Sequence, residues 1–141
     1  SSDLIGSKAA ASPYFAIQAA KTFGADHIAV SIDAKGDEVA THGWVDGSSR
    51  KVMTFAETLL THGVNTLIYT DISRDGMLSG PNFDMMKKLQ ALEGIHLIAS
   101  GGVSGAEDLR KLSAMGVYGA ITGKALYEGK VTMEEIQEIQ E

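Results

Sequence analysis

Two hydrophobic patterns alternate along this chain. Short, almost uniformly apolar runs predict buried strands, and longer segments with apolar residues three or four positions apart predict helices. The predicted strands cover residues 28–32, 66–70, 96–100 and 118–122, and the predicted helices cover residues 13–23, 51–62, 83–92, 104–115 and 132–141. Apolar strands that alternate with helices are typical of an α/β fold, with a parallel sheet and helices outside it.

Polar residues at the ends of these segments add detail to the prediction. Ser104 and Glu107 have the spacing of a capping box, and Thr132 and Glu135 repeat that spacing before the last helix. Residues 35–41 follow the first predicted strand and predict a small hairpin. We therefore expect strands that pass into helices through short, polar connections.

The first residues resemble a segment near the C-terminus. Residues 4–9 and 120–125 share an isoleucine, a glycine and a Lys-Ala pair, and both lie where a strand passes into a helix. A (β/α)8 barrel takes about 250 residues. We therefore expect the single domain formed by residues 1–141 to be the C-terminal half of such a barrel, and the serine-rich start without methionine indicates an internal cut. The alternative is a complete, flavodoxin-like open sheet.

A half-barrel leaves the edges of its sheet unpaired. We expect either the N-terminal half of the barrel or a second copy of the chain to cover them.

Composition narrows the possible partners. A formal charge of −6 and a pI near 5.1 argue against nucleic acid as a ligand, because a net acidic chain provides no overall basic field to bind a polyanion. The chain has no cysteine, its histidines show no ligand spacing, and no apolar run approaches the roughly 20 residues of a membrane span. We expect a soluble, cytoplasmic protein without a metal.

Polar residues after the predicted strands mark a candidate site. Asp33 directly follows the first strand, where partial desolvation favours the protonated carboxyl of a general acid, although a helix cap or an ion pair is the alternative. Thr70 ends the next strand, and its hydroxyl can orient a carboxylate or a sugar hydroxyl. Asp75 can serve the same site or only its own turn, and Trp44 is either a lid over a flat ligand or part of the local core.

Glycine-rich turns follow the last two predicted strands. Backbone N–H groups in such turns, together with a helix N-terminus, can bind a phosphate. The alternative is that the glycines only permit sharp turns. The candidate residues are Ser100, Gly101, Gly102, Gly123 and Lys124, with Gly6 and Ser7 as a second site across the barrel mouth. We therefore predict a substrate with a phosphate at each end.

Several segments together resemble a known family. Residues 30–34, 39–44, 69–76, 98–103 and 123–129 are similar to the C-terminal half of the phosphoribosylformimino-5-aminoimidazole carboxamide ribotide isomerases of histidine biosynthesis. This half runs from the end of the fourth barrel strand through the eighth helix. The resemblance implies an Amadori rearrangement of an aminoaldose to an aminoketose, with no metal or organic cofactor.

The resemblance also implies roles for individual residues. Asp33 would be the general acid that opens the ribose ring, and Thr70 would assist it. Trp44, Asp75 and Ser100 would contact the substrate. The general base of the family is an aspartate on the first strand, which this chain does not contain. We therefore expect the isolated chain to be inactive.

Two alternatives differ in what they predict. The cyclase subunit of imidazole glycerol phosphate synthase shares the barrel, but the sequence of residues 70–76 follows the isomerase pattern. The second alternative is a half-barrel that binds a phosphorylated metabolite or a partner chain without catalysis. It predicts that Asp33→Asn in the complete barrel leaves the behaviour of the protein unchanged.

Overall fold

A parallel sheet lies at the centre of the protein. The computed structural model describes residues 3–5, 13–40, 51–74, 79–123, 129 and 131–140. In the sheet, β1 (Asp3–Ile5), β2 (Ile28–Lys35), β4 (Thr66–Asp71), β5 (His96–Ser100) and β6 (Gly119–Ile121) follow one another in chain order, and β3 (Glu38–Val39) pairs with β2 in the antiparallel direction. This topology confirms the predicted α/β fold.

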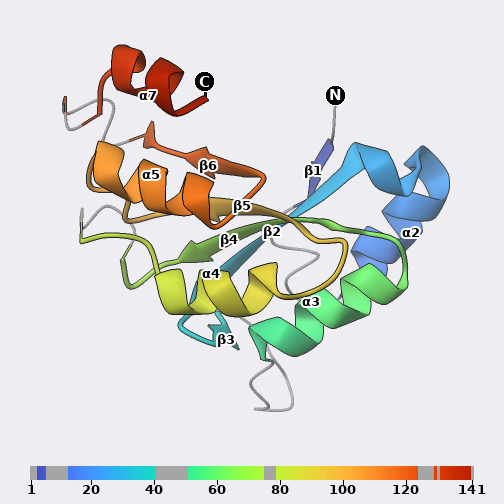
Figure 1. The fold of residues 1–141 in the computed structure, drawn as a ribbon. Helices are drawn as coiled ribbons and strands as arrows, with labels where there is room; N and C mark the ends of the chain where they lie inside the picture. Colours follow the sequence, from blue (N-terminus) through green and yellow to red (C-terminus); the bar gives the residue numbers. More distant parts are fainter. Residues whose placement is uncertain are drawn as a thin grey trace.

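Helices surround the convex side of the curved sheet. They are α2 (Pro13–Phe23), a short 3-10 helix η1 (Ala25–His27), α3 (Val52–Thr61), α4 (Phe83–Gln90), α5 (Ala106–Ala114) and α7 (Met133–Gln140). In Figure 1, α2, α3, α4 and α5 follow one another around the sheet, whose two edges are formed by β1 and β6. No helix in the described part of the chain is long and apolar enough to span a membrane.

The hydrophobic core lies between these helices and one face of the sheet. The strands contribute Ile28, Val30, Ile32 and Ala34 from β2, Leu67 and Tyr69 from β4, and Leu97 and Ala99 from β5. The helices contribute Phe55, Leu59, Met86, Leu89 and Leu112, among others. Burial of each large aliphatic side chain stabilises the fold by about 1.5 to 3 kcal/mol.

The residues between these core positions lie on the other face of the sheet, because side chains alternate along a strand. We call this surface the open face; it carries Ala29, Ser31, Asp33, Ile68, Thr70, Ile98, Ser100, Gly119 and Ile121. Ile121 is 48% exposed on it, although isoleucine is usually buried.

The first long strand extends further than its apolar run predicts. The prediction ends this strand at residue 32, whereas β2 continues to Lys35. The reason is the predicted hairpin, because Ala34 pairs with Val39 and the Ala40 N–H donates to the Asp33 carbonyl over 2.8 Å. Asp33 therefore lies within the strand and not after it.

One of the two predicted capping boxes is wrong. Thr132 and Glu135 form the expected reciprocal hydrogen bonds, with the Thr132 N–H donating to Glu135 over 3.0 Å and the Glu135 N–H donating to the Thr132 hydroxyl over 3.1 Å. At the start of α5, however, Asp108 and not Glu107 accepts the hydrogen bond from the Ser104 N–H, at 2.8 Å. The shorter Asp108 side chain turns back into the loop and is buried, whereas Glu107 is exposed.

Candidate functional site

Three of the predicted site residues form a row across the open face. Strand register places Asp33 of β2 beside Thr70 of β4, and Thr70 beside Ser100 of β5. Paired residues on neighbouring parallel strands point to the same face, and adjacent strands lie about 4.8 Å apart. The row therefore places one carboxyl group and two hydroxyl groups within about 10 Å at the carboxyl ends of the strands.

The three side chains differ in their exposure to solvent. Thr70 is 8% exposed and Ser100 is partly buried, whereas Asp33 is exposed. The desolvation expected around Asp33 is therefore not supplied by the described part of the chain. Asp33 lies near the end of β2 on the open face, where the sheet alone leaves a side chain in contact with water.

The predicted glycine turns lie next to this row. Gly101 and Gly102 follow Ser100 directly, and both have a positive φ, of 84° and 82°. Gly123 lies two residues beyond Ile121, which pairs with Ser100. The ends of β5 and β6 therefore bring two glycine segments to the same edge of the sheet, beside the hydroxyl of Ser100.

The turn at Gly102 is in close contact with the loop that follows β4. The Gly80 N–H donates to the Gly102 carbonyl over 2.7 Å. A Cβ atom at position 102 would lie 2.6 Å from the Gly80 carbonyl oxygen and 3.3 Å from Cβ of Arg74. Glycine at this position is thus required both by the backbone conformation and by the neighbouring loop.

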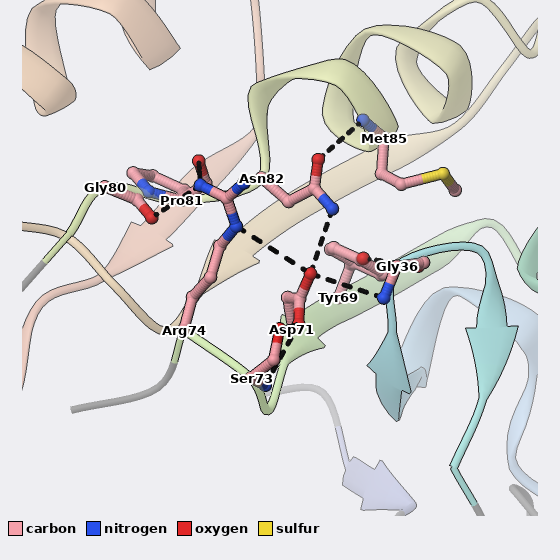
Figure 2. Close-up of polar contacts among 9 residues, drawn as sticks. All are labelled: Gly36, Tyr69, Asp71, Ser73, Arg74, Gly80, Pro81, Asn82 and Met85. Atoms are coloured by element: carbon pink, nitrogen blue, oxygen red, sulfur yellow. Dashed lines mark hydrogen bonds and ion pairs between the residues drawn. The ribbon is translucent and has the colours of Figure 1, made fainter. Parts of the chain in front are cut away.

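Behind the row, on the helix side of the sheet, Asp71 holds two loops together, the β2–β3 turn and the loop from β4 to α4 (Figure 2). Its Oδ1 accepts hydrogen bonds from the Ser73 N–H, over 3.0 Å, and from the Ser73 hydroxyl. Its Oδ2 accepts hydrogen bonds from the Asn82 side chain over 2.9 Å and from the Gly36 N–H over 3.3 Å, and Arg74 Nε lies 3.9 Å away. The side chain of Asp71 is only 4% exposed.

These contacts determine the ionisation of Asp71. Burial alone would raise the pKa of this carboxyl, but the hydrogen bonds donated by Ser73, Asn82 and Gly36 outweigh it and lower the pKa below the ordinary value. Burial, with the charge of Asp71, raises the pKa of the neighbouring Tyr69. The Tyr69 hydroxyl donates to the Gly36 carbonyl over 2.7 Å, so it acts as a neutral hydrogen-bond donor.

The sequence did not identify this cluster as part of the site. One signal was present, because Asp71 follows Thr70 at a strand end and the alternation of side chains places it on the opposite face. Its partners Gly36 and Asn82 are 35 and 11 residues away in the chain, so their approach follows from the register of the sheet.

Several predicted site residues are outside the described part of the chain: Gly6, Ser7, Trp44, Asp75 and Lys124. Their roles stay predictions. Among the described residues, no three His, Cys, Asp or Glu side chains gather as ligands for a metal ion.

The described groups are suited to acid–base chemistry on a small polar substrate. Asp33 can donate or accept a proton, and the Thr70 and Ser100 hydroxyls can orient substrate oxygens beside it. The adjoining glycine turns can present backbone N–H groups to an anionic group, next to the N-terminus of α5. A phosphorylated sugar offers matching groups at both places.

The chain is similar to known proteins of histidine biosynthesis. A family model described as histidine biosynthesis protein matches residues 2–132. A protein of Listeria welshimeri is 50% identical over 137 residues, covering 97% of this chain and 57% of its own length. A protein of Alkaliphilus metalliredigens is 47% identical over 134 residues, covering 95% of this chain and 56% of its own.

A third relative, from Lachnoclostridium phytofermentans, is 46% identical over 131 residues, covering 93% of this chain and 55% of its own length. All three are named 1-(5-phosphoribosyl)-5-((5-phosphoribosylamino)methylideneamino)imidazole-4-carboxamide isomerase. The chain spans a little more than half the length of these relatives. Since the family model covers almost the whole sequence, the chain belongs to the histidine biosynthesis protein family.

Proposed function

We propose that this chain is the C-terminal half of a (β/α)8 barrel and carries the general acid of the isomerase for which its relatives are named. The observation that carries this proposal is the row of Asp33, Thr70 and Ser100, in register on one face and next to two glycine turns. The reaction is the Amadori rearrangement of an aminoaldose to an aminoketose on a substrate with two phosphates.

Asp33 supplies the first proton of this reaction. Its carboxyl group protonates the ring oxygen of the aminoaldose, the bond from that oxygen to C1 breaks, and the amino nitrogen forms a double bond to C1 as a Schiff base. A base then removes the proton from C2, and the resulting enol tautomerises to the ketone. Thr70, the direct neighbour of Asp33 across the sheet, orients the sugar oxygens during these steps.

The glycine turns at the ends of β5 and β6 hold one phosphate of the substrate. Gly101 and Gly102 provide backbone N–H groups close to Ser100, and Gly123 with Lys124 completes the site. Gly6 and Ser7 contribute to a second phosphate site across the barrel mouth. Anchoring at both ends fixes the sugar over Asp33, which reduces the entropy lost in reaching the transition state.

The remaining half of the barrel supplies the general base and covers the open face. The exposed Ile121 and the partly buried Ile98 lie on this face, as expected for the inside of a barrel that continues beyond β1 and β6. The length of the relatives leaves room for such a half. Enclosure by it would also remove Asp33 from bulk water.

Replacement of Asp33 by asparagine in the longer protein that we propose contains this chain, hereafter the full-length protein, tests the acid role. Asparagine keeps the size of the side chain and cannot donate an acidic proton. We expect Asp33→Asn to lower kcat by about 100-fold to 10,000-fold while substrate still binds. Steady-state kinetics and calorimetric titration with the substrate measure the two quantities.

Asp84→Asn is the matched control, since Asp84 is an exposed aspartate in the first turn of α4, on the helix side of the sheet. It should leave kcat and substrate affinity unchanged. Unchanged turnover in Asp33→Asn would refute the assignment of Asp33. A wild-type protein that binds the bisphosphate but does not convert it would instead identify a binding scaffold.

A further inference from the structure

We propose that Asp71 is a positioning residue: its carboxylate holds the β2–β3 turn and both ends of the β4–α4 loop in one arrangement at the site end of the sheet and thereby fixes the catalytic row. The inference rests on the proposed function and extends it to a residue that faces away from the substrate. Asp71 lies directly after Thr70 but points to the helix side of the sheet, so it acts only through other residues.

The two loops come from separate parts of the chain. Gly36 is in the turn between β2 and β3. Ser73 and Arg74 begin the loop that connects β4 to α4, and Asn82, the N-cap of α4, ends that same loop. Each contributes a hydrogen-bond donor or a positive charge to the two oxygens of Asp71. A single buried carboxylate therefore joins the β2–β3 turn to both ends of the β4–α4 loop.

Further bonds extend this arrangement on both sides. The Tyr69 hydroxyl donates to the Gly36 carbonyl, over 2.7 Å, which fixes the same turn from a second direction. Asn82 Oδ1 accepts the Met85 N–H over 3.2 Å, so one side chain caps α4 and binds Asp71 (Figure 2). The first turn of α4 and the turn after β2 are thus connected through two side chains.

Arg74 continues the connection toward the proposed phosphate site. Its guanidinium is 3.9 Å from Asp71 and donates to the carbonyls of Gly80, over 3.4 Å, and Pro81, over 3.3 Å. Gly80 in turn donates to the Gly102 carbonyl over 2.7 Å. The chain of contacts from Asp71 therefore ends at the glycine turn beside Ser100.

The catalytic row is attached to the same segments by its backbone. Thr70 precedes Asp71, and the Ile72 N–H donates to the Ala34 carbonyl over 2.9 Å, one residue beyond Asp33. A change in the loops around Asp71 would therefore move the ends of β2 and β4 relative to each other. Displacement of a catalytic group by about 1 Å can lower a rate by about 100-fold.

The donors around Asp71 also explain why a carboxylate is needed. In the described part of the chain, the groups that contact its oxygens are N–H or O–H donors and a guanidinium. An amide at this position has only one acceptor oxygen, and its NH2 group would face other donors. Asp71→Asn keeps the shape of the side chain but cannot accept all of these hydrogen bonds.

The test compares the full-length protein with Asp71→Asn and with the exchange Asp71→Asn/Asn82→Asp. The exchange restores a donor–acceptor pair between positions 71 and 82, and aspartate caps a helix as well as asparagine does. At a temperature where circular dichroism shows all proteins folded, we expect Asp71→Asn to lower kcat by about 10-fold to 100-fold with a smaller change in KM. The exchange should recover part of this loss.

Leu59→Ala is the control for loss of stability. Leu59 is a core residue, 2% exposed, in the last turn of α3. It packs near Val64 and Leu67 at the start of β4, at the opposite end of the strand from Asp71. Leu59→Ala should lower the melting temperature and leave kcat within about threefold. Asp71→Asn with wild-type kcat, or an exchange variant no faster than Asp71→Asn, would overturn the positioning role.

Amide hydrogen exchange separates this proposal from the proposed function. Asp71→Asn should accelerate exchange at both Gly36 and Ser73, and Leu59→Ala should not. An inactive wild-type protein would refute the proposed isomerase, and the exchange rates would then decide whether Asp71 holds the loops together. Unchanged exchange at Gly36 and Ser73 would refute the role of Asp71 in holding the loops together.

Discussion

Thr70 and Asp71 are adjacent residues with separate tasks at the end of β4. Thr70 lies on the open face beside Asp33 and Ser100, where a substrate can contact it. Asp71 faces the helices and binds the loops through donors from Gly36, Ser73 and Asn82. Because side chains alternate along a strand, two consecutive residues can have different roles: Thr70 faces the substrate side of the sheet, and Asp71 supports the loops on the other side.

The lowered pKa of Asp71 predicts how the stability of the full-length protein depends on pH. The native state prefers the ionised carboxylate, so the stabilisation is complete above the ordinary aspartate pKa of about 3.9 and is lost as the pH falls through the lower native pKa. The difference in unfolding free energy between wild type and Asp71→Asn should therefore shrink as the pH falls below about 4. Urea unfolding between pH 2.5 and pH 7 measures it.

An equal difference at every pH would show that the ionised form of Asp71 has no special stability in the native state. Asp84→Asn serves as the control, because Asp84 is exposed and its replacement should change the unfolding free energy little at any pH.

At the scale of elements, the loops after β4 and β5 are fitted to each other. Gly80 and Gly102 approach so closely that a side chain is excluded at position 102, and Arg74 packs against the same point. The hairpin after β2 reaches the same region through Gly36. Specific contacts thus join three of the connections at the carboxyl ends of the strands.

Gly102→Ala tests this packing. Alanine at a positive φ costs about 1 kcal/mol, and the contact with the Gly80 carbonyl adds about 1 to 3 kcal/mol. Gly94→Ala is the matched control, because Gly94 has a φ of 82° like Gly102 but no atom lies within 4 Å of the added Cβ. Denaturant unfolding of the full-length variants should show a larger loss of stability for Gly102→Ala. Equal losses would mean that the loop moves aside without cost.

Much of this architecture follows from sequence patterns, for reasons that particular elements make clear. The helical spacing of residues 13–23 and the apolar run at 96–100 have the boundaries of α2 and β5. β2 is longer than predicted because its end is paired with β3, a contact that hydrophobicity alone does not report. Local patterns thus predict elements well and their ends less well.

The candidate site also contains residues that local patterns predict and residues that only long-range contacts reveal. Asp33, Thr70 and Ser100 could be predicted because each lies near the carboxyl end of a strand, and parallel strands bring those ends together. Asp71 could not be assigned, since its role depends on Gly36 and Asn82, which approach it only in the folded sheet. Likewise, Asp108 replaced Glu107 as the partner of Ser104 because of burial in the loop.

At the scale of the whole molecule, the two faces of the sheet are unequal. The helix side is packed, whereas the open face carries Ile121 at 48% exposure. A hollow of about 350 Å³ also lies between α5, β6 and α7, lined by Leu112, Tyr118 and Ile136 among others. Both features are near the edge strand β6, where the proposed barrel continues into its other half.

If the proposed function is right, the isolated chain should show no turnover, because the proposed general base would be on the other half. It should associate with a separately produced N-terminal half and regain activity. Ile121→Lys places a charge on the open face and should weaken this association by about tenfold or more, as the loss of a buried isoleucine contact of about 1.5 to 3 kcal/mol implies. Light scattering and the rate of the mixture measure association and activity.

Phe23→Lys is the control, because Phe23 is 60% exposed at the end of α2, on the helix side of the sheet. It should leave the association unchanged. Turnover by the isolated chain would contradict the division of acid and base between two halves, and equal effects of the two lysine variants would mean that the halves meet elsewhere.

The opposite orientations of Thr70 and Asp71 have a consequence for protein engineering. Positions 33, 70 and 100 can be randomised together in a library without touching the contacts of Asp71, because those contacts lie on the other side of the sheet. Selection for a new substrate can then act on the open face while the loops keep their arrangement. Catalysis in this scaffold can evolve without a new fold having to evolve with it.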